Sequence, residues 1–407
     1  MDYCVQDESR RILRECILSD ETLQIPQSIS NAAESVTFIG DDVRPFLPSP
    51  SKMTESASAL SALVAAAASA IAADRYGIEY QKVKINTDLA SVSLFSVILP
   101  TVDGAPFMEN KKLREEIAKG NLYEVDKPIR AQSTNLYHTK DGKWYYLHGS
   151  LNPSVTMQML GIEDTGEAVT HEEAVEVYKA KVAQWASSAI EETANLEYRQ
   201  PGVVCHTHEE FLVSEQTKGK VMSKEPLYTL RALPAPRSEW PPAAPRSVDF
   251  KPLAGIRVVD FSRVIAAPVV SKILAVLGAE VVKVSWSGLP DHGFLWVDLS
   301  AGKRDADINL KSDEGKEAFS ALLKGADVLI DGYRPGVLQR LGFAPQVLRK
   351  INPSLVIPRI SKRSSDTETT VFRLAITTAY KCFFRKRTPQ CRTLDRIYFS
   401  VQSIFGK

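Results

Sequence analysis

The chain has 407 residues, of which 44% are hydrophobic, an ordinary share for a globular protein and enough to bury a core. Its formal net charge of +1 gives no reason to expect nucleic acid or an anionic membrane as a partner. Five widely spaced cysteines form no disulfide framework and fit a reducing compartment. The N-terminus has no signal-peptide pattern, so we expect a cytoplasmic protein.

The first part of the chain combines helical and strand patterns. Residues 1–53 form a mixed segment that ends in a proline-containing loop. Within residues 57–73, apolar side chains recur at helical spacing between serines, and Gly77 stands where a C-terminal helix cap is expected. A bilayer span needs about 20 apolar residues, so this stretch predicts a buried helix instead.

The remainder of residues 54–230 is mostly helical by pattern, with some strand. YQKVKIN (80–86) alternates polar and apolar residues, which predicts a strand. NLYHTKDGKWYYLHG (135–149) places two aromatic-rich runs around Asp141-Gly142, which predicts a β-hairpin. Residues 170–196 return to helical spacing.

A proline-rich segment, residues 231–252, separates this region from the next, and we place the main domain boundary there. Residues 253–360 then alternate strand and helix patterns. The predicted elements are strands at IRVVDF, EVVKVS and ADVLID, a helix from Pro268 to Gly278, a helix at 312–324 and a short helix ending near Gly342. This pattern predicts an α/β fold, with a Rossmann-like parallel sheet following a mainly helical α+β region. The first strand is followed by SRVIAAP, without the glycines of a dinucleotide-binding fingerprint, which argues against a nicotinamide dehydrogenase.

Five blocks in residues 252–360 occur in one order: PLAGIRVVDFSRVIAAP, LGAEVVKV, GKRDADINLKSDEGKEAF, ADVLIDGYRPGVLQRLGF and INPSLV. Together they resemble the amino-terminal half of the class III CoA-transferases, a family that includes formyl-CoA transferase, carnitine CoA-transferases and α-methylacyl-CoA racemase. The resemblance implies acyl-CoA chemistry, with coenzyme A as a substrate, a small carboxylic acid as acceptor, and a homodimer.

The earlier region resembles the same family, but its carboxyl-terminal part. Residues 57–100 are similar to the family's alanine-rich helix and the strand after it, and residues 135–150 and 199–216 resemble later segments. The chain therefore carries the family's carboxyl part first and its amino part second. Either a circular permutation or a tandem of two partial copies explains this order, with residues 231–252 as the joint.

Cationic side chains in the second region suit the phosphate groups of CoA, namely Lys303, Arg304, Lys311 and Arg340. The resemblance, carried over by position, implies CoA contacts at Val264, Ile308, Lys311 and Arg340. Two departures from the family pattern are visible. Ala267 stands where the family usually has a glycine, and Gly332 stands where many members have an asparagine.

The catalytic residue of the family is an aspartate that attacks the acyl-CoA thioester, after a glycine-rich loop that follows the NPxLV strand. Residues 361–407 instead form a basic tail unlike the family, whose only glycine is Gly406, and Asp366 lies too near the strand to be assigned as nucleophile. The catalytic residue is therefore unknown. Three functions stay open: CoA transfer, epimerisation of an acyl-CoA, or an inactive CoA-binding or assembly subunit.

No metal site is expected. Cys205, His206 and His208 are too close in sequence to supply four converging ligands, and no second cluster accompanies them.

Overall fold

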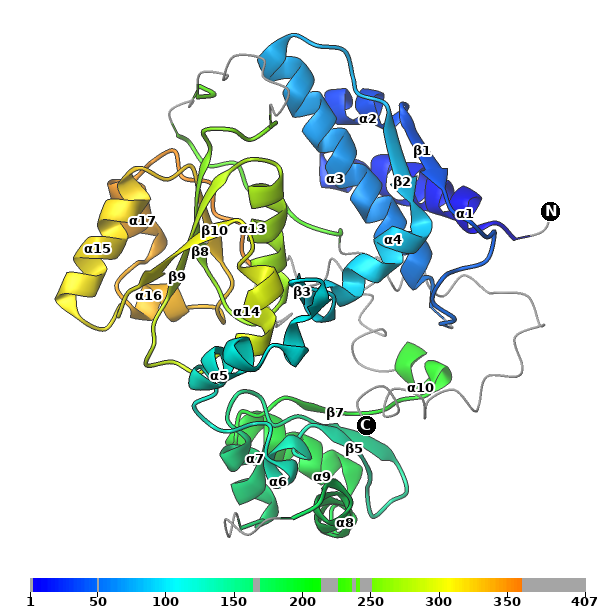
Figure 1. Ribbon diagram of the computed structural model, residues 1–407, viewed down its shortest axis with the longest axis vertical. Coiled ribbons are helices and arrows are strands. Elements are labelled where there is room, and N and C mark those ends of the chain that lie inside the picture. Colours follow the sequence, from blue (N-terminus) through cyan, green and yellow to red (C-terminus); the bar gives the residue numbers. More distant parts are fainter. Residues whose placement is uncertain are drawn as a thin grey trace. The chain divides into compact units, whose positions relative to one another are not determined.

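The structure is a computed structural model that describes residues 3–49, 51–163, 169–213, 226–235, 239–241 and 251–360. The described residues fall into two compact units (Figure 1). One unit takes its residues from Met1–Leu94 and Met222–Ala232, and the other from Phe95–Val221 and Leu233–Thr369. Together they have mixed helices and sheets, including parallel sheets, which is an α/β architecture.

The first unit is built around a parallel β-α-β crossover. β1 (Val36–Ile39) pairs in parallel with β2 (Val83–Asn86), and the long helix α3 (Met53–Tyr76) connects them. The other elements are helical: α1 (Val5–Arg11), the π-helical η1 (Ile12–Leu18), η2 (Glu21–Leu23), α2 (Gln27–Ala33) and α4 (Thr87–Val92), with η3 (Ser93–Ile98) following. The strand predicted at residues 80–86 is confirmed, although only its second half is paired.

Helix α3 extends the predicted helix at both ends and stops at Gly77, whose φ of 61° is the left-handed conformation expected of a glycine cap. It is long and apolar enough to cross a membrane, a test that core helices of globular proteins also pass. One face of it, with Ala59, Ala62 and Ala66, is fully buried in the core of the first unit. Small side chains on that face let the neighbouring elements approach the helix closely.

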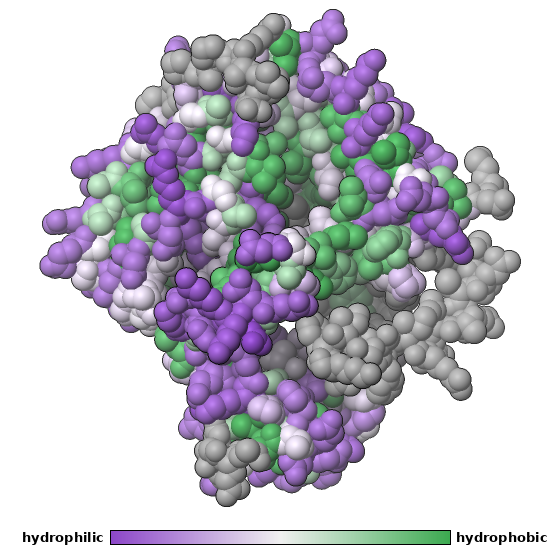
Figure 2. Space-filling view, viewed as in Figure 1, coloured by the Kyte–Doolittle hydropathy of each residue, from purple (hydrophilic) through white to green (hydrophobic). Residues whose placement is uncertain are grey.

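Several apolar side chains are exposed where α4 leads into η3, and Figure 2 shows hydrophobic colour over this stretch. The exposed residues there are Leu89, Leu94, Phe95, Ile98 and Leu99. Exposed apolar side chains grouped in this way are uncommon on the surface of a monomer, so we expect this stretch to limit solubility.

The second unit begins with small elements around an antiparallel sheet. They are β3 (Thr101–Val102), β4 (Ala105–Pro106), η4 (Phe107–Glu109), α5 (Lys111–Lys119), α6 (Pro128–Ala131), β5 (Asn135–His138), β6 (Trp144–Leu147), α7 (Pro153–Leu160), α8 (His171–Val182), α9 (Ser187–Glu192), η5 (Thr193–Glu197), β7 (Gly202–Val204) and α10 (His208–Leu212). β5, β6 and β7 form the sheet, so the predicted hairpin is confirmed. Gly142 turns it with a φ of 74°.

The same unit contains a four-stranded, entirely parallel sheet in the order β10-β9-β8-β11. Its elements are β8 (Arg257–Phe261), α13 (Ala266–Val276), β9 (Glu280–Ser285), α14 (Gly293–Leu299), β10 (Lys303–Asp307), α15 (Asp313–Lys324), β11 (Val328–Asp331), α16 (Val337–Arg340) and α17 (Pro345–Ile351). Figure 1 shows α13 and α14 on one side of this sheet and α15, α16 and α17 on the other. Parallel strands need this cover, because both of their faces are apolar.

Most of these elements follow the predicted pattern, with four differences, one of which is that α17 was not predicted. The helix predicted to begin at Pro268 begins two residues earlier, so this proline is its third residue. β10 was not predicted, because its sequence is charged and it lies at the edge of the sheet, where one side of the strand is not paired. α14 was not predicted either, since it has only seven residues.

Two glycines allow α5 and α14 to pack closely within the second unit. A β-carbon on Gly293 would lie 2.5 Å from the Ile117 carbonyl oxygen, and one on Gly120 would lie 2.7 Å from the Trp296 ring. The Phe107 and Phe294 rings add a contact with centroids 5.2 Å apart. This contact joins the segment before the proline-rich stretch to the segment after it.

Candidate functional site

The four residues implied as CoA contacts all lie beyond the carboxyl ends of strands in the parallel sheet. Val264 follows β8, Ile308 directly follows β10, Lys311 comes three residues later, and Arg340 ends the helix after β11. The chain order of the strands reverses at β8, and ligands of open α/β sheets bind at the carboxyl edge beside such a point. Among the described residues, no hydrogen bond or ion pair joins these four side chains to one another.

Val264 holds an unusual backbone conformation. Its φ is 69°, although it is a β-branched residue for which the left-handed region is strongly disfavoured. Its side chain is 36% exposed, so burial of the valine does not account for the strain. Strained backbone of this kind costs about 1–3 kcal/mol and clusters at ligand-binding loops, which makes the loop between β8 and α13 a candidate contact segment.

Lys311 is exposed, and its ammonium lies 5.7 Å from the ring centroid of Trp286, within cation–π range. Trp286 directly follows β9, whereas Lys311 comes after β10, so sheet pairing brings the two together. The backbone N–H of Lys311 donates to Asn309 Oδ1 at 3.0 Å, which orders the turn. The pair offers a positive charge for a phosphate and a flat ring for a purine.

Sequence reasoning missed Trp286. Its only signal was a tryptophan placed immediately after a buried strand of a parallel sheet, where ligand-binding side chains gather. Arg340, at the far end of the site, is exposed and makes no ion pair among the described residues. It is therefore free of a protein anion in the part of the chain that the structure describes.

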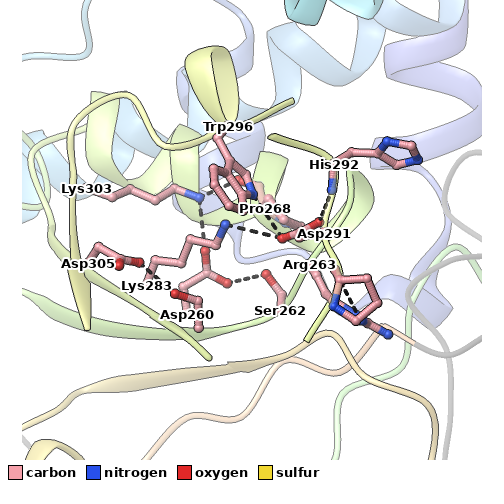
Figure 3. A network of polar contacts seen from close by, with 12 residues as sticks. Asp260, Ser262, Arg263, Pro268, Lys283, Asp291, His292, Trp296, Lys303 and Asp305 are labelled. Atoms are coloured by element: carbon pink, nitrogen blue, oxygen red, sulfur yellow. Dashed lines mark hydrogen bonds and ion pairs between the residues drawn. The ribbon is translucent and has the colours of Figure 1, made fainter. Parts of the chain in front are cut away.

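The assignment of Lys303 as a phosphate ligand is wrong. Its side chain is 1% exposed, and its ammonium donates to Asp260 Oδ2 at 2.9 Å, to the Pro268 carbonyl at 2.9 Å and to Ser271 Oγ at 2.7 Å (Figure 3). Burial lowers the pKa of Lys303, which the charge of Asp260 opposes. With three internal acceptors, this ammonium joins β10 to β8 and α13 instead of facing a ligand.

Two further ion pairs lie in the same buried region. Lys283 Nζ is 3.6 Å from Asp291 Oδ2, and Trp296 Nε1 donates to the same oxygen at 3.0 Å (Figure 3). Lys272 pairs with Asp298, which also accepts from Ser96 Oγ at 2.7 Å. Burial lowers the pKa of the neighbouring His292, which favours its neutral form. These pairs connect the sheet with α13 and α14.

The part of the sequence in which the family's nucleophile is expected, residues 361–407, lies outside the described residues, as does Asp366. Over the ranges that the structure describes, no three His, Cys, Asp or Glu side chains converge as they would around a metal ion.

Residues 253–365 match the sequence profile of CoA-transferase family III. The match places residues 253–365 in CoA-transferase family III. The chain is 33% identical to the acetyl-coenzyme A transferase nodX of Hypoxylon pulicicidum over 81% of its own length and 57% of that protein. It is 30% identical to an acyl-CoA transferase of Gibberella moniliformis, over 76% of its length and 54% of that protein. It is also 34% identical to a formyl-CoA:oxalate CoA-transferase of Afipia carboxidovorans, over 27% and 29% of the two chains.

The similar solved structures match a shorter part of the chain. A crystal structure from Mycobacterium tuberculosis is 32% identical over 28% of this chain and 34% of that one, with a TM-score of 0.26. The chain spans little more than half the length of the two fungal relatives. An alignment covering 81% of 407 residues includes positions on both sides of residues 231–252. The order of segments around the proline-rich stretch is therefore shared with the Hypoxylon relative.

Proposed function

We propose that this chain binds coenzyme A at the carboxyl edge of the parallel sheet and takes part in CoA transfer from an acyl-CoA to a carboxylic acid. The observation that carries the proposal is the pairing of Lys311 with Trp286, beside the strained loop of Val264. The β10-β9-β8-β11 unit then acts as a Rossmann-like base for the ligand, with Ile308 and Arg340 lining the same edge.

The names of the relatives support the type of reaction. Acetyl-coenzyme A, formyl-CoA and oxalate are named for proteins similar to this chain, so an acyl thioester and a small carboxylic acid are the proposed substrates. In the family, the transfer is divided into steps by a carboxylate nucleophile. This carboxylate attacks the thioester carbonyl and releases the CoA thiolate. Epimerisation of an acyl-CoA at its α-carbon is the variant that the same binding site would also serve.

An inactive CoA-binding or assembly subunit is the second candidate. The observation in its favour is the composition of residues 361–407, which offers no glycine-rich loop to position a nucleophile. Removing a nucleophile typically costs several orders of magnitude in rate. We further propose that the protein is a cytoplasmic homodimer, without nucleic acid or membrane as a partner. Residues 54–230 then correspond to the carboxyl part of the family, residues 231–252 to a linker, and residues 253–360 to the CoA-binding part.

The binding proposal is tested by isothermal titration calorimetry with CoA. Lys311→Ala should weaken binding by about 1.5–3 kcal/mol, the worth of a charge-assisted phosphate contact. Lys316→Ala is the matched control, since Lys316 lies five residues away and pairs with Asp313 on the exposed face of α15. Equal CoA affinity in wild type and Lys311→Ala, with both proteins folded, would remove the assignment.

The two functions are separated by an activity measurement. Purified protein is incubated with acyl-CoAs and carboxylic acids, treated with hydroxylamine, and examined by mass spectrometry for an enzyme-bound acyl or CoA adduct. A transferase should give turnover, whereas an inactive subunit should bind CoA without turnover. Turnover with an adduct on an aspartate or glutamate would instead establish the transferase and identify its nucleophile.

A further inference from the structure

A cavity of about 660 Å³ lies in the first unit, between α2 and the carboxyl end of α3. It is lined by Ser28 of α2, by side chains in the last two turns of α3, and by residues 78–80, which follow the Gly77 cap. Small-molecule sites typically have volumes of about 300–1,000 Å³, so this cavity is large enough for a ligand. Its lining residues, all in the described part of the chain, lie outside the parallel sheet on which the proposed function rests.

Apolar side chains form one part of this lining. Ala70 and Ala73 stand about one turn apart on α3, and their short side chains leave the space beside the helix open. Tyr80 adds the surface of an aromatic ring, and it also packs against the core of the first unit. The Gln81 backbone N–H donates to Ser69 Oγ at 2.8 Å, which holds the segment after α3 against the helix. The apolar wall is therefore fixed by a hydrogen bond and by core packing.

Two carboxylates, those of Asp74 and Glu79, complete the lining. Neither side chain makes a hydrogen bond or an ion pair in the part of the chain that the structure describes. Arg75, which lies between them in sequence, places its guanidinium carbon 5.6 Å from the ring centroid of Tyr76. Asp74 also stands in the last turn of α3, where free backbone carbonyls already give the helix end a partial negative charge. The cavity therefore gathers negative charge, and its described lining contains no basic residue that would balance it.

We propose that this cavity binds an aliphatic diamine, with its ammonium groups at Asp74 and Glu79 and its methylene chain against Ala70, Ala73 and Ile78. An ammonium donates only, and it therefore complements carboxylates that lack a donor. The aliphatic chain covers the apolar wall, which a metal ion with its oxygen ligands would leave in water. The inference goes beyond the proposed function, because CoA carries phosphates that these two carboxylates would repel.

A saturation-transfer NMR titration with two probes tests the inference. The probes 1,5-diaminopentane and 1,5-pentanediol have the same methylene chain, but only the diamine is charged at pH 7. The wild type should bind the diamine at least about tenfold more tightly than the diol, and added salt should reduce this preference. Glu79→Gln and Asp74→Asn should each weaken diamine binding about threefold to tenfold. Glu21→Gln is the matched control, because Glu21 is an exposed acid of the same unit that does not line the cavity.

Ala73→Met tests the cavity itself, because it keeps both carboxylates and fills the space beside α3. It should abolish diamine binding, and a variant that still binds as the wild type does would overturn the site. Equal binding of the two probes would overturn the choice of a cation, and an equal loss in Glu21→Gln would show a general charge effect instead of a contact. Failure of the wild type to bind the diamine would overturn the inference and leave CoA binding untouched. Thermal unfolding checks that each variant is folded, and Glu79→Gln, an exposed change outside any helix, keeps the test decisive if the α3 variants unfold.

Discussion

The β-carbon of Ala267 lies 2.5 Å from the position that a β-carbon on residue 332 would occupy, and Gly332 leaves that position empty. Ser262 limits the same space, since its β-carbon is also 2.5 Å away. The two departures from the family pattern are therefore linked. The alanine at 267 adds a methyl group where the family usually has a glycine, and the glycine at 332 removes the side chain that would collide with it.

This relationship predicts non-additive stabilities. Gly332→Ala should destabilise the protein by about 1–3 kcal/mol, because the new methyl group overpacks a buried turn. Ala267→Gly should cost about 0.5–1 kcal/mol through helix propensity. The double variant should be more stable than the sum of the two losses implies, by at least about 0.5 kcal/mol in urea unfolding. Ala275→Gly, at the other end of α13, should combine additively with Gly332→Ala, and strict additivity in both pairs would contradict the linkage.

The buried pair of Lys303 and Asp260 predicts a stability effect in place of a ligand effect. Lys303→Met should cost about 3–5 kcal/mol, because it leaves the Asp260 carboxylate buried without its cation. Chemical denaturation measures the loss, and Arg304→Met, the exposed neighbour on β10, should change stability little. A stable Lys303→Met protein that had lost only CoA binding would restore Lys303 to the ligand site.

The packing of α5 against α14 predicts unequal effects of two glycine substitutions. Gly293→Ala should destabilise the second unit by about 1–3 kcal/mol, because its methyl group would meet the backbone carbonyl of Ile117, which cannot move independently. Gly120→Ala meets the Trp296 ring instead, and a side chain gives way more easily. Thermal unfolding should therefore rank Gly293→Ala as the less stable variant, and the reverse ranking would show that the backbone approach is not the limiting contact.

The raised pKa of Asp331 predicts a pH-dependent stability. Between the ordinary aspartate range and a pKa of about 6, the folded state binds more protons than the unfolded state, so stability falls as pH rises through this interval. The groups around this carboxyl are the Arg359 guanidinium and the Tyr333 backbone N–H, both of which oppose the effect of burial. Asp331→Asn should therefore be about 1–3 kcal/mol more stable than wild type at pH 8 and nearly equal to it at about pH 3, below the ordinary aspartate pKa. Urea unfolding that gives the same difference in unfolding free energy between the two proteins at both pH values would contradict this prediction.

The local elements of the parallel sheet could be predicted from the sequence. EVVKVS coincides with β9, and the helix predicted at 312–324 is present, with Ser312 as its N-cap. Gly77 ends α3 as its type and position indicated. These features depend on residues within a few positions of one another, through side-chain periodicity and through backbone groups at helix ends, so their information is contained in short stretches of sequence.

Only part of the candidate site could be predicted from local sequence patterns. The sequence placed Val264, Ile308, Lys311 and Arg340 after strands, and the parallel sheet puts the carboxyl ends of those strands along one edge. The direction of each side chain could not be predicted from the sequence. Lys303 and Lys311 are both lysines in one charged segment, yet one is buried against Asp260 and the other is exposed beside Trp286. Alternation along β10 turns Lys303 inward, whereas Lys311 lies four residues beyond the end of β10, in the turn before α15.

The sequence by itself determined the resemblance of residues 253–360 to the family, through the order of their blocks, and the α/β class and most elements, through side-chain periodicity. Only the tertiary structure decided which distant residues meet, such as Asp331 with Arg359 and Ala267 with Gly332. Those meetings depend on strand order and close packing. Their energies arise between segments separated by tens of residues, where no local pattern of residues records them.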